Sequence, residues 1–261
     1  MLNKLVNELS ISYDLVERIH HRITGNRETV IRRQEAIIYG VRRTENTNIA
    51  LPDYLDDCPV CELEKGLFEG NSNIEYVTLP KHLIKIHEKV FYNCNNLKAI
   101  EFPDELELID SLAFGNCTSL QKVDLSKKSV LLFDRVFSGC TNLSDIELSD
   151  DQSSLSKYLF EDTGYYNDKS NWKDGILFIG PYLIAAKDKK GSYEVPEGTK
   201  MIADYAFEDN HELRNVTLPE SLKDVGFATF SNCKSITITG PTHAFDFEIG
   251  LFEHPPHFFD I

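Results

Sequence analysis

The amino-acid sequence predicts a mostly β solenoid in which coils of about 23 residues stack on one another. The first observation is a set of phenylalanines that recur every 23 residues, with one interval of 47. The second is an alternating apolar pattern that follows each phenylalanine and ends in proline or serine. The third is another apolar stretch that leads into the next phenylalanine. The recurring residues are Phe68, Phe91, Phe114, Phe137, Phe160, Phe207 and Phe230.

Each repeat is predicted to contribute two short strands joined by polar turns. In the segment KVFYNCNNLKAIEFP, Ile100 and Phe102 alternate with outward residues, and Pro103 ends the strand because proline has no N–H to donate. Leu106 and Ile109 then lead into the next phenylalanine. One repeat cannot bury its apolar face alone, so we expect stacked repeats to share a continuous core beneath parallel strands.

These segments resemble the BspA-like leucine-rich repeat family over roughly residues 35–261. The resemblance implies a leucine-rich-repeat solenoid and a binding or adhesion module, but it implies no ligand. Residues 161–195 resemble the hairpin-bearing variant repeat of that family, with a turn at Gly180-Pro181, which accounts for the long interval. We expect residues 239–261 to form a C-terminal cap over the last open face of the stack.

Residues 1–34 have no counterpart in the repeat pattern. Leu2, Leu5, Val6 and Leu9 fit a helical stripe, and so do Leu15, Ile19 and Ile23. We therefore predict a helical cap or extension there, followed by a hairpin of residues 30–33 against 36–39. The alternative is a separate basic docking element, because seven of the nine arginines of the chain lie in residues 1–48.

The charge balance argues against nucleic-acid binding. The chain has 27 basic and 42 acidic residues, a net charge of −15. Residues 1–48 hold eight basic and six acidic residues, so the remainder carries 19 against 36, a net of −17. Such a surface repels phosphate backbones and favours a basic protein partner.

The sequence contains neither an apolar run long enough to span a membrane nor the pattern of a secretory signal. The expectation is a cytoplasmic chain if the sequence is complete. The family resemblance implies instead a cell-surface or secreted protein.

The cysteines are predicted to be structural. Four of them share one repeat position with Asn71 and Asn210, and a position that takes Cys or Asn serves packing and turns. Cys58 and Cys61 form a C-x-x-C, but neither a second metal-binding pair nor a thioredoxin-like pattern accompanies them. Nucleophile-elbow, P-loop and dinucleotide motifs are missing from the sequence. We predict no catalytic residue, no cofactor and no metal site. The four repeat cysteines are Cys94, Cys117, Cys140 and Cys233.

The first candidate binding surface is a column of carboxylates. Glu101, Asp124 and Glu147 occupy the same outward position in successive repeats, between Thr78 and Thr217 in the outer repeats. Like charges on neighbouring strands are destabilising, so such a column suits a cation or a basic partner. The alternative is a solvated polar ladder whose charges are screened.

The second candidate is aromatic. The hairpin-bearing segment carries Tyr165, Tyr166 and Trp172, and Trp172 is the only tryptophan of the chain. Tryptophan and tyrosine are enriched at binding hot spots. The alternative is that these side chains fill a small core beneath the hairpin.

Together these features predict a non-catalytic protein-binding or adhesion module that presents a repeat-built surface. A structural, self-assembling surface component is the alternative, and an enzyme comes third because the sequence shows no convergent set of titratable groups.

Overall fold

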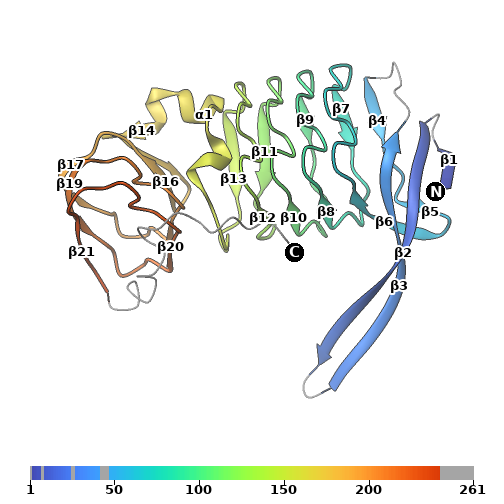
Figure 1. Ribbon diagram of the computed structural model, residues 1–261, viewed down its shortest axis with the longest axis horizontal. Helices are drawn as coiled ribbons and strands as arrows, with labels where there is room; N and C mark the ends of the chain where they lie inside the picture. The colour runs from blue at the N-terminus through green and yellow to red at the C-terminus, as the bar shows by residue number, and fades with distance from the viewer. Residues whose placement is uncertain (1, 7–8, 25–26, 42–46, 242–261) are drawn as a thin grey trace.

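The computed structural model describes residues 2–6, 9–24, 27–41 and 47–241 of the chain. They form an elongated right-to-left stack of coils in the view of Figure 1, preceded by a long two-stranded ribbon. The stack confirms the predicted solenoid, and its strands form rows that run along the length of the molecule.

The upper row contains the strands with the alternating pattern. Val77 pairs with Ile100, and Val123 pairs with Ile146, in parallel register, and all four side chains are buried while their strand neighbours are exposed. The apolar residues therefore face the core, and the residues between them form an outer strand face. The strands are β4 (Asn48–Ala50), β7 (Tyr76–Thr78), β9 (Ala99–Ile100), β11 (Lys122–Leu125) and β13 (Asp145–Leu148).

The lower row is formed by the second apolar stretch of each repeat. Ile86 pairs with Ile109, which pairs with Leu132, again in parallel register. These strands are short because polar turns bound them on both sides. They are β6 (Cys58–Leu63), β8 (Lys85–Ile86), β10 (Leu108–Ile109) and β12 (Leu131–Leu132), and β5 (Tyr54–Leu55) pairs antiparallel with β6.

The phenylalanines stack along the core. The ring centroids of Phe91 and Phe114 lie 5.1 Å apart and those of Phe114 and Phe137 lie 5.6 Å apart, with the rings nearly parallel. The Cys117 thiol donates to the carbonyl of Phe91 at 3.1 Å. Asn210 fills the same position and donates to the carbonyl of Phe207 at 3.0 Å. The Cys-or-Asn position therefore satisfies a buried backbone carbonyl, as a packing and turn role requires.

The turn after each phenylalanine adopts a left-handed backbone. The second residue after the ring has positive φ in the repeats, and it is always Gly, Asn or Asp, which tolerate that conformation best. At Gly139 a Cβ would lie 2.1 Å from the Asn116 side-chain oxygen, so a larger residue there would displace the Asn116 side chain of the neighbouring coil.

The variant repeat inserts a hairpin into the stack. Strand β16 pairs antiparallel with β15 around Gly180, which has a φ of 55°, and pairs parallel with β18 in the next coil. The 47-residue interval is therefore two coils, one of which carries the hairpin. Its elements are 3-10 helices Lys157–Phe160 and Lys169–Asn171, α1 (Gly164–Asn167), β14 (Trp172–Lys173), β15 (Ile176–Ile179) and β16 (Tyr182–Ala186).

The last coils continue the two kinds of strand. Strand β18 pairs with β20 as in the lower row, and β17, β19 and β21 form a separate parallel sheet. Most of the expected C-terminal cap, residues 242–261, lies outside the described residues. The strands are β17 (Lys190–Glu194), β18 (Met201–Ile202), β19 (Glu212–Thr217), β20 (Asp224–Val225) and β21 (Thr237–Thr239).

The prediction of an N-terminal helical cap is wrong, because this segment forms β-strands. Strands β1 (Leu2–Val6), β2 (Leu9–Thr24) and β3 (Arg27–Val41) form an antiparallel sheet, and β3 pairs parallel with β6 through residues 36–38. The expected hairpin of residues 30–33 against 36–39 is also wrong, because residue 33 pairs with Arg18 of β2. Ile11 and Tyr13 are buried, so the sheet covers the open edge of the first coil by adding strands.

Among the described residues, no helix has the length and apolar composition that crossing a membrane requires.

Candidate functional site

The acidic column predicted from the sequence exists on the outer strand face. Asp124 of β11 lies directly beside Glu147 of β13 in the parallel register, and Glu101 follows the last residue of β9 in the preceding coil. All three side chains are exposed. We call these three residues the acidic strip.

One lysine neutralises part of the strip. The Lys122 ammonium group lies 2.5 Å from a Glu147 oxygen and 3.1 Å from an Asp145 oxygen. Among the described residues, Glu101 and Asp124 form no ion pair. The Ser126 hydroxyl and N–H donate to one Asp124 oxygen at 2.6 and 2.9 Å, which lowers the pKa of that carboxyl and keeps it charged. The charges of Lys122 and Lys127 also contribute to the lowered pKa of Asp124, although neither lysine forms an ion pair with it.

An exposed tyrosine stands at the N-terminal end of this face. Tyr76 of β7 is 45% exposed, and the Lys98 ammonium group lies 5.8 Å from its ring centroid. Tyr76 was not among the residues predicted from the sequence, although its outward position in the alternating pattern indicates exposure. A large aromatic side chain beside charged residues is a common anchor in protein interfaces.

The strip does not extend to Thr217. Strand β13 pairs with β11 alone among the described strands, whereas Thr217 lies in the separate sheet of β17, β19 and β21. There its hydroxyl lies 3.2 Å from that of Thr239. The inserted hairpin interrupts the row, so the acidic strip is confined to three successive coils.

The aromatic residues of the insertion contact one another. The rings of Tyr166 and Trp172 meet edge-on with centroids 5.2 Å apart, and the Trp172 indole N–H donates to the Tyr166 carbonyl at 2.7 Å. The Lys187 ammonium group lies 4.2 and 4.3 Å from the two ring centroids. Desolvation against these rings lowers the pKa of Lys187. Both aromatic side chains thus already have partners within the insertion.

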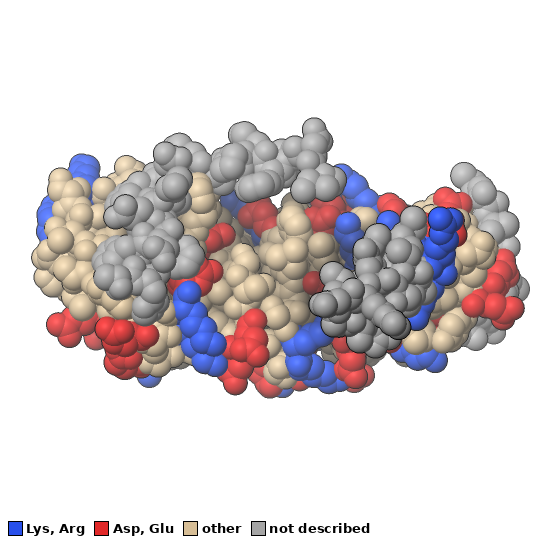
Figure 2. Space-filling model, turned by 90° about the horizontal axis from the view of Figure 1, so that it is seen from below, with Lys and Arg blue, Asp and Glu red and all other residues tan. Residues whose placement is uncertain are grey.

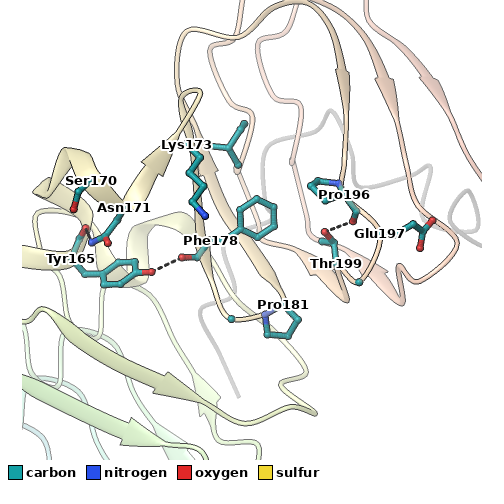
Figure 3. A pocket seen from close by; sticks show the side chains of 12 residues that line it. Tyr165, Ser170, Asn171, Lys173, Phe178, Pro181, Pro196, Glu197 and Thr199 are labelled. Atoms are coloured by element: carbon teal, nitrogen blue, oxygen red, sulfur yellow. Dashed lines mark hydrogen bonds between the residues drawn. The ribbon is translucent and has the colours of Figure 1, made fainter.

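Tyr165 lines a cleft of about 610 Å³ between the hairpin and the turn before β18 (Figure 3). Its hydroxyl donates to the Phe178 carbonyl at 2.7 Å. The Phe178 ring and the rings of Pro181 and Pro196 border the same opening, and Lys173 extends beside it. The cleft is open and bordered by apolar rings, so it suits an extended chain segment better than a buried small molecule.

The lower row carries a small cluster of a different kind. Glu62, Glu64 and His87 place possible ligand atoms within 4.8 Å of one another. The His87 Nε2 lies 2.7 Å from a Glu62 oxygen, and the Arg18 guanidinium donates to the other Glu62 oxygen. This hydrogen bond from His87 lowers the pKa of Glu62. The carboxylate is thus satisfied by side chains of this chain, and the cluster supports the base of the N-terminal ribbon.

The outer surface of the lower row is mixed in character. Leu131 and Phe133 are 40% and 42% exposed. Figure 2 shows the molecule from below, with uncharged surface near the middle of the stack and acidic and basic side chains interspersed along its rim. Two exposed apolar side chains make a small patch, and such residues are ordinary on soluble proteins.

The thiols of Cys94 and Cys61 are buried in the core. Burial raises the pKa of Cys94 and of Cys61 to about 12, so both thiols stay protonated near neutral pH. Protonated, buried thiols are poor nucleophiles and poor metal ligands. The C-x-x-C of β6 therefore contributes to the core.

Comparisons with known proteins agree with the repeat architecture. A family model described as a BspA type leucine rich repeat region matches residues 62–187 and 177–255, in six copies. The comparison with curated proteins gave no match.

Several solved structures are similar to this chain. A leucine rich repeat protein of T. pallidum is 25% identical, with a TM-score of 0.51, and the match covers 84% of this chain and 88% of that one. A leucine rich cell surface protein of Faecalibacterium prausnitzii is 16% identical, with a TM-score of 0.44, over 92% of this chain and 76% of that one. The pneumococcal vaccine antigen PcpA is 19% identical, with a TM-score of 0.45, over 93% of this chain and 71% of that one.

The family model covers most of the stack, and the structure shows why its spacing recurs: each phenylalanine, each Cys or Asn and each strand occupies one fixed place in a coil. The chain belongs to the BspA-type leucine-rich repeat family.

Proposed function

We propose that this chain is a non-catalytic protein-binding module that contacts a basic partner through the acidic strip. The observation that carries the proposal is that Glu101 and Asp124 are exposed, lie in one column, and form no ion pair among the described residues. Exposed charges on a rigid face that are not held in an ion pair are available to an oppositely charged partner.

The surroundings of the strip suit protein recognition. Tyr76 offers an aromatic contact at one end, and Lys122 fixes Glu147 and Asp145 at the other. The strands hold these side chains on a rigid scaffold, so little conformational entropy is lost when a partner binds. The proposed binding surface is thus an aromatic anchor followed by exposed carboxylates, two of which form no ion pair among the described residues.

The test uses the intact chain as bait to capture partners and then measures the affinity of a captured partner for two variants. Glu101→Gln with Asp124→Asn removes two charges from the strip. Glu107→Gln with Asp134→Asn removes two exposed charges beside β10 and β12, so both variants have the same net charge.

We expect the strip variant to bind at least about tenfold more weakly, which corresponds to about 1.4 kcal/mol, and the control to bind like the original chain. Equal affinities for the two variants would show that the strip is not the binding surface.

A further inference from the structure

Three polar side chains from successive coils form a row at the N-terminal end of the stack. Each follows a strand-ending proline by two residues, and stacking places equivalent positions of neighbouring coils side by side. Tyr54 begins β5, which lies beside β6 at that end of the molecule (Figure 1), His82 precedes β8, and Glu105 precedes β10. The three prolines are Pro52, Pro80 and Pro103.

The row is a chain of hydrogen bonds. The Tyr54 hydroxyl lies 2.7 Å from His82 Nε2, and His82 Nδ1 lies 3.2 Å from both carboxylate oxygens of Glu105. An ionised carboxylate accepts hydrogen bonds and donates none, so Glu105 assigns the proton of the neutral imidazole to Nδ1 and leaves the lone pair on Nε2. The Tyr54 hydroxyl therefore donates to Nε2, which is the direction of proton transfer that a general base requires.

The row is open to solvent. Tyr54 is 47% exposed, and the side chains of His82 and Glu105 are 25% and 55% exposed. Asp53 holds Lys81 beside the row, with the ammonium group 3.0 Å from an Asp53 oxygen and 5.1 Å from the Tyr54 ring centroid. A reagent can thus approach the phenol from solvent while its hydroxyl is in contact with a base.

Tyr76 shows what the row adds to an exposed tyrosine. It is 45% exposed, and the Lys98 ammonium group lies 5.8 Å from its ring centroid, much as Lys81 lies beside Tyr54. Among the described residues, no side chain accepts a hydrogen bond from the Tyr76 hydroxyl. The two tyrosines therefore share their exposure and a neighbouring cation, and they differ in the histidine that contacts only one of them.

We propose that Tyr54 is a nucleophilic modification site that accepts an acyl group from an activated ester, with His82 as its general base. The Tyr54 oxygen attacks the carbonyl carbon of the ester, and its proton passes to His82 Nε2. The bond to the leaving oxygen then breaks, the electron pair departs with that oxygen, and the oxygen takes the proton from His82. Glu105 holds the imidazole in the required tautomer and stabilises the imidazolium that forms.

The charges around the row favour an uncharged donor. Asp53 and Glu105 place carboxylates on both sides of the tyrosine–histidine pair, and these would repel a phosphoryl donor, which carries several negative charges. An ester has no such charge. The step modifies the chain once and leaves a tyrosyl ester, so it is compatible with a binding module. None of these residues belongs to the acidic strip, and the inference is independent of the proposed function.

The test treats the intact chain briefly with p-nitrophenyl acetate and locates the acetyl groups by mass spectrometry. Cleavage after lysine and arginine places Tyr54 in residues 44–65 and Tyr76 in residues 66–81, each as the only tyrosine of its peptide. We expect Tyr54 to be acetylated at least about tenfold faster than Tyr76 near neutral pH, because a positioned general base commonly contributes more than that.

One substitution separates the base from mere exposure. His82→Gln keeps a carbonyl oxygen that can accept from the Tyr54 hydroxyl but cannot take its proton, so it should slow Tyr54 acetylation to the rate at Tyr76. His211→Gln removes another exposed histidine, and this control should change neither rate. In heavy water the reaction at Tyr54 should be slower, because the base moves a proton as the new bond forms, and His82→Gln should abolish this slowing.

Two results would overturn the inference. Acetylation of Tyr54 no faster than that of Tyr76 would show that the row does not activate the phenol. A fast reaction at Tyr54 that His82→Gln leaves unchanged would show that the histidine is not its base. The comparison of the two tyrosines needs no variant, so it stands even if a substitution disturbs the fold.

Discussion

At the residue scale, a few side chains repeat their role in the regular coils. Phenylalanine fills the core, and Gly, Asn or Asp forms the left-handed turn after it. Cys117 satisfies the carbonyl of the phenylalanine one coil earlier, and Asn210 satisfies that of the phenylalanine in its own coil. The side chains in these places were predictable from spacing alone. The role of Cys and Asn as donors to a buried carbonyl was not, because it depends on which atoms the stacking brings together.

Asp204 has an environment that its sequence position does not reveal. One of its oxygens accepts the Phe227 N–H at 2.7 Å. Burial nevertheless raises the pKa of Asp204 to about 6, and the nearby charge of Asp224 adds to the shift. The folded chain therefore holds this proton more tightly than the unfolded chain does.

Stability that depends on the neutral Asp204 is fully present below pH 4 and is lost as the pH rises to about 6. Asp204→Asn keeps an acceptor for the Phe227 N–H and removes the charge. We expect the variant to be more stable than the original chain by about 1–2 kcal/mol at pH 7.5, and equally stable below pH 4. Urea unfolding at the two pH values measures this. A variant that is less stable at pH 7.5 would contradict the assignment.

At the element scale, the apolar spacing of the N-terminal segment led to a wrong prediction of helix. Leu15, Ile19 and Ile23 recur every four residues, which fits a helix and a strand equally well, because four is also an even number. Leu9, Ile11, Tyr13 and Leu15 alternate strictly, and this is the signal that indicated a strand. The exposed edge of β6 then decides the structure, since added strands satisfy its backbone and a helix would not.

The ribbon has two parts with different effects on stability. Ile38 is fully buried where β3 meets β6, whereas residues 14–24 of β2 and 27–35 of β3 pair only with each other in the described structure. We expect Ile38→Ala to lower the free energy of unfolding by about 2–5 kcal/mol. Replacing residues 20–31 by Asn-Gly, which joins the paired residues 19 and 32 through a tight turn, should change it by less than about 0.5 kcal/mol. Chemical denaturation compares the two, and a large loss of stability in the shortened chain would show that the far end of the ribbon stabilises the stack.

At the scale of the whole molecule, the repeat spacing predicted the stack and the place of the acidic strip. It could not predict how far the strip extends, because the inserted hairpin separates β13 from the last sheet, and Thr217 lies there. It also could not show that Lys122 compensates Glu147, or that Lys187 packs on Tyr166 and Trp172. Those contacts depend on side chains from different coils.

The solenoid explains why a surface rather than a pocket is proposed as the binding site. Each coil from β4 to β13 adds one strand to the upper row, so recognition residues are spread along a rigid face, and the core beneath them is filled by phenylalanine, leucine and isoleucine. The aromatic cleft of the insertion, which Tyr165 lines, is a second possible contact surface.

Amide hydrogen exchange of the intact chain, with and without a captured partner, locates the contact and so separates the acidic strip from the aromatic cleft. We predict slower exchange in β9, β11 and β13, at residues 99–101, 122–125 and 145–148, with the cleft residues 165–181 unchanged. Slower exchange in residues 165–181, with the three strands unchanged, would contradict it.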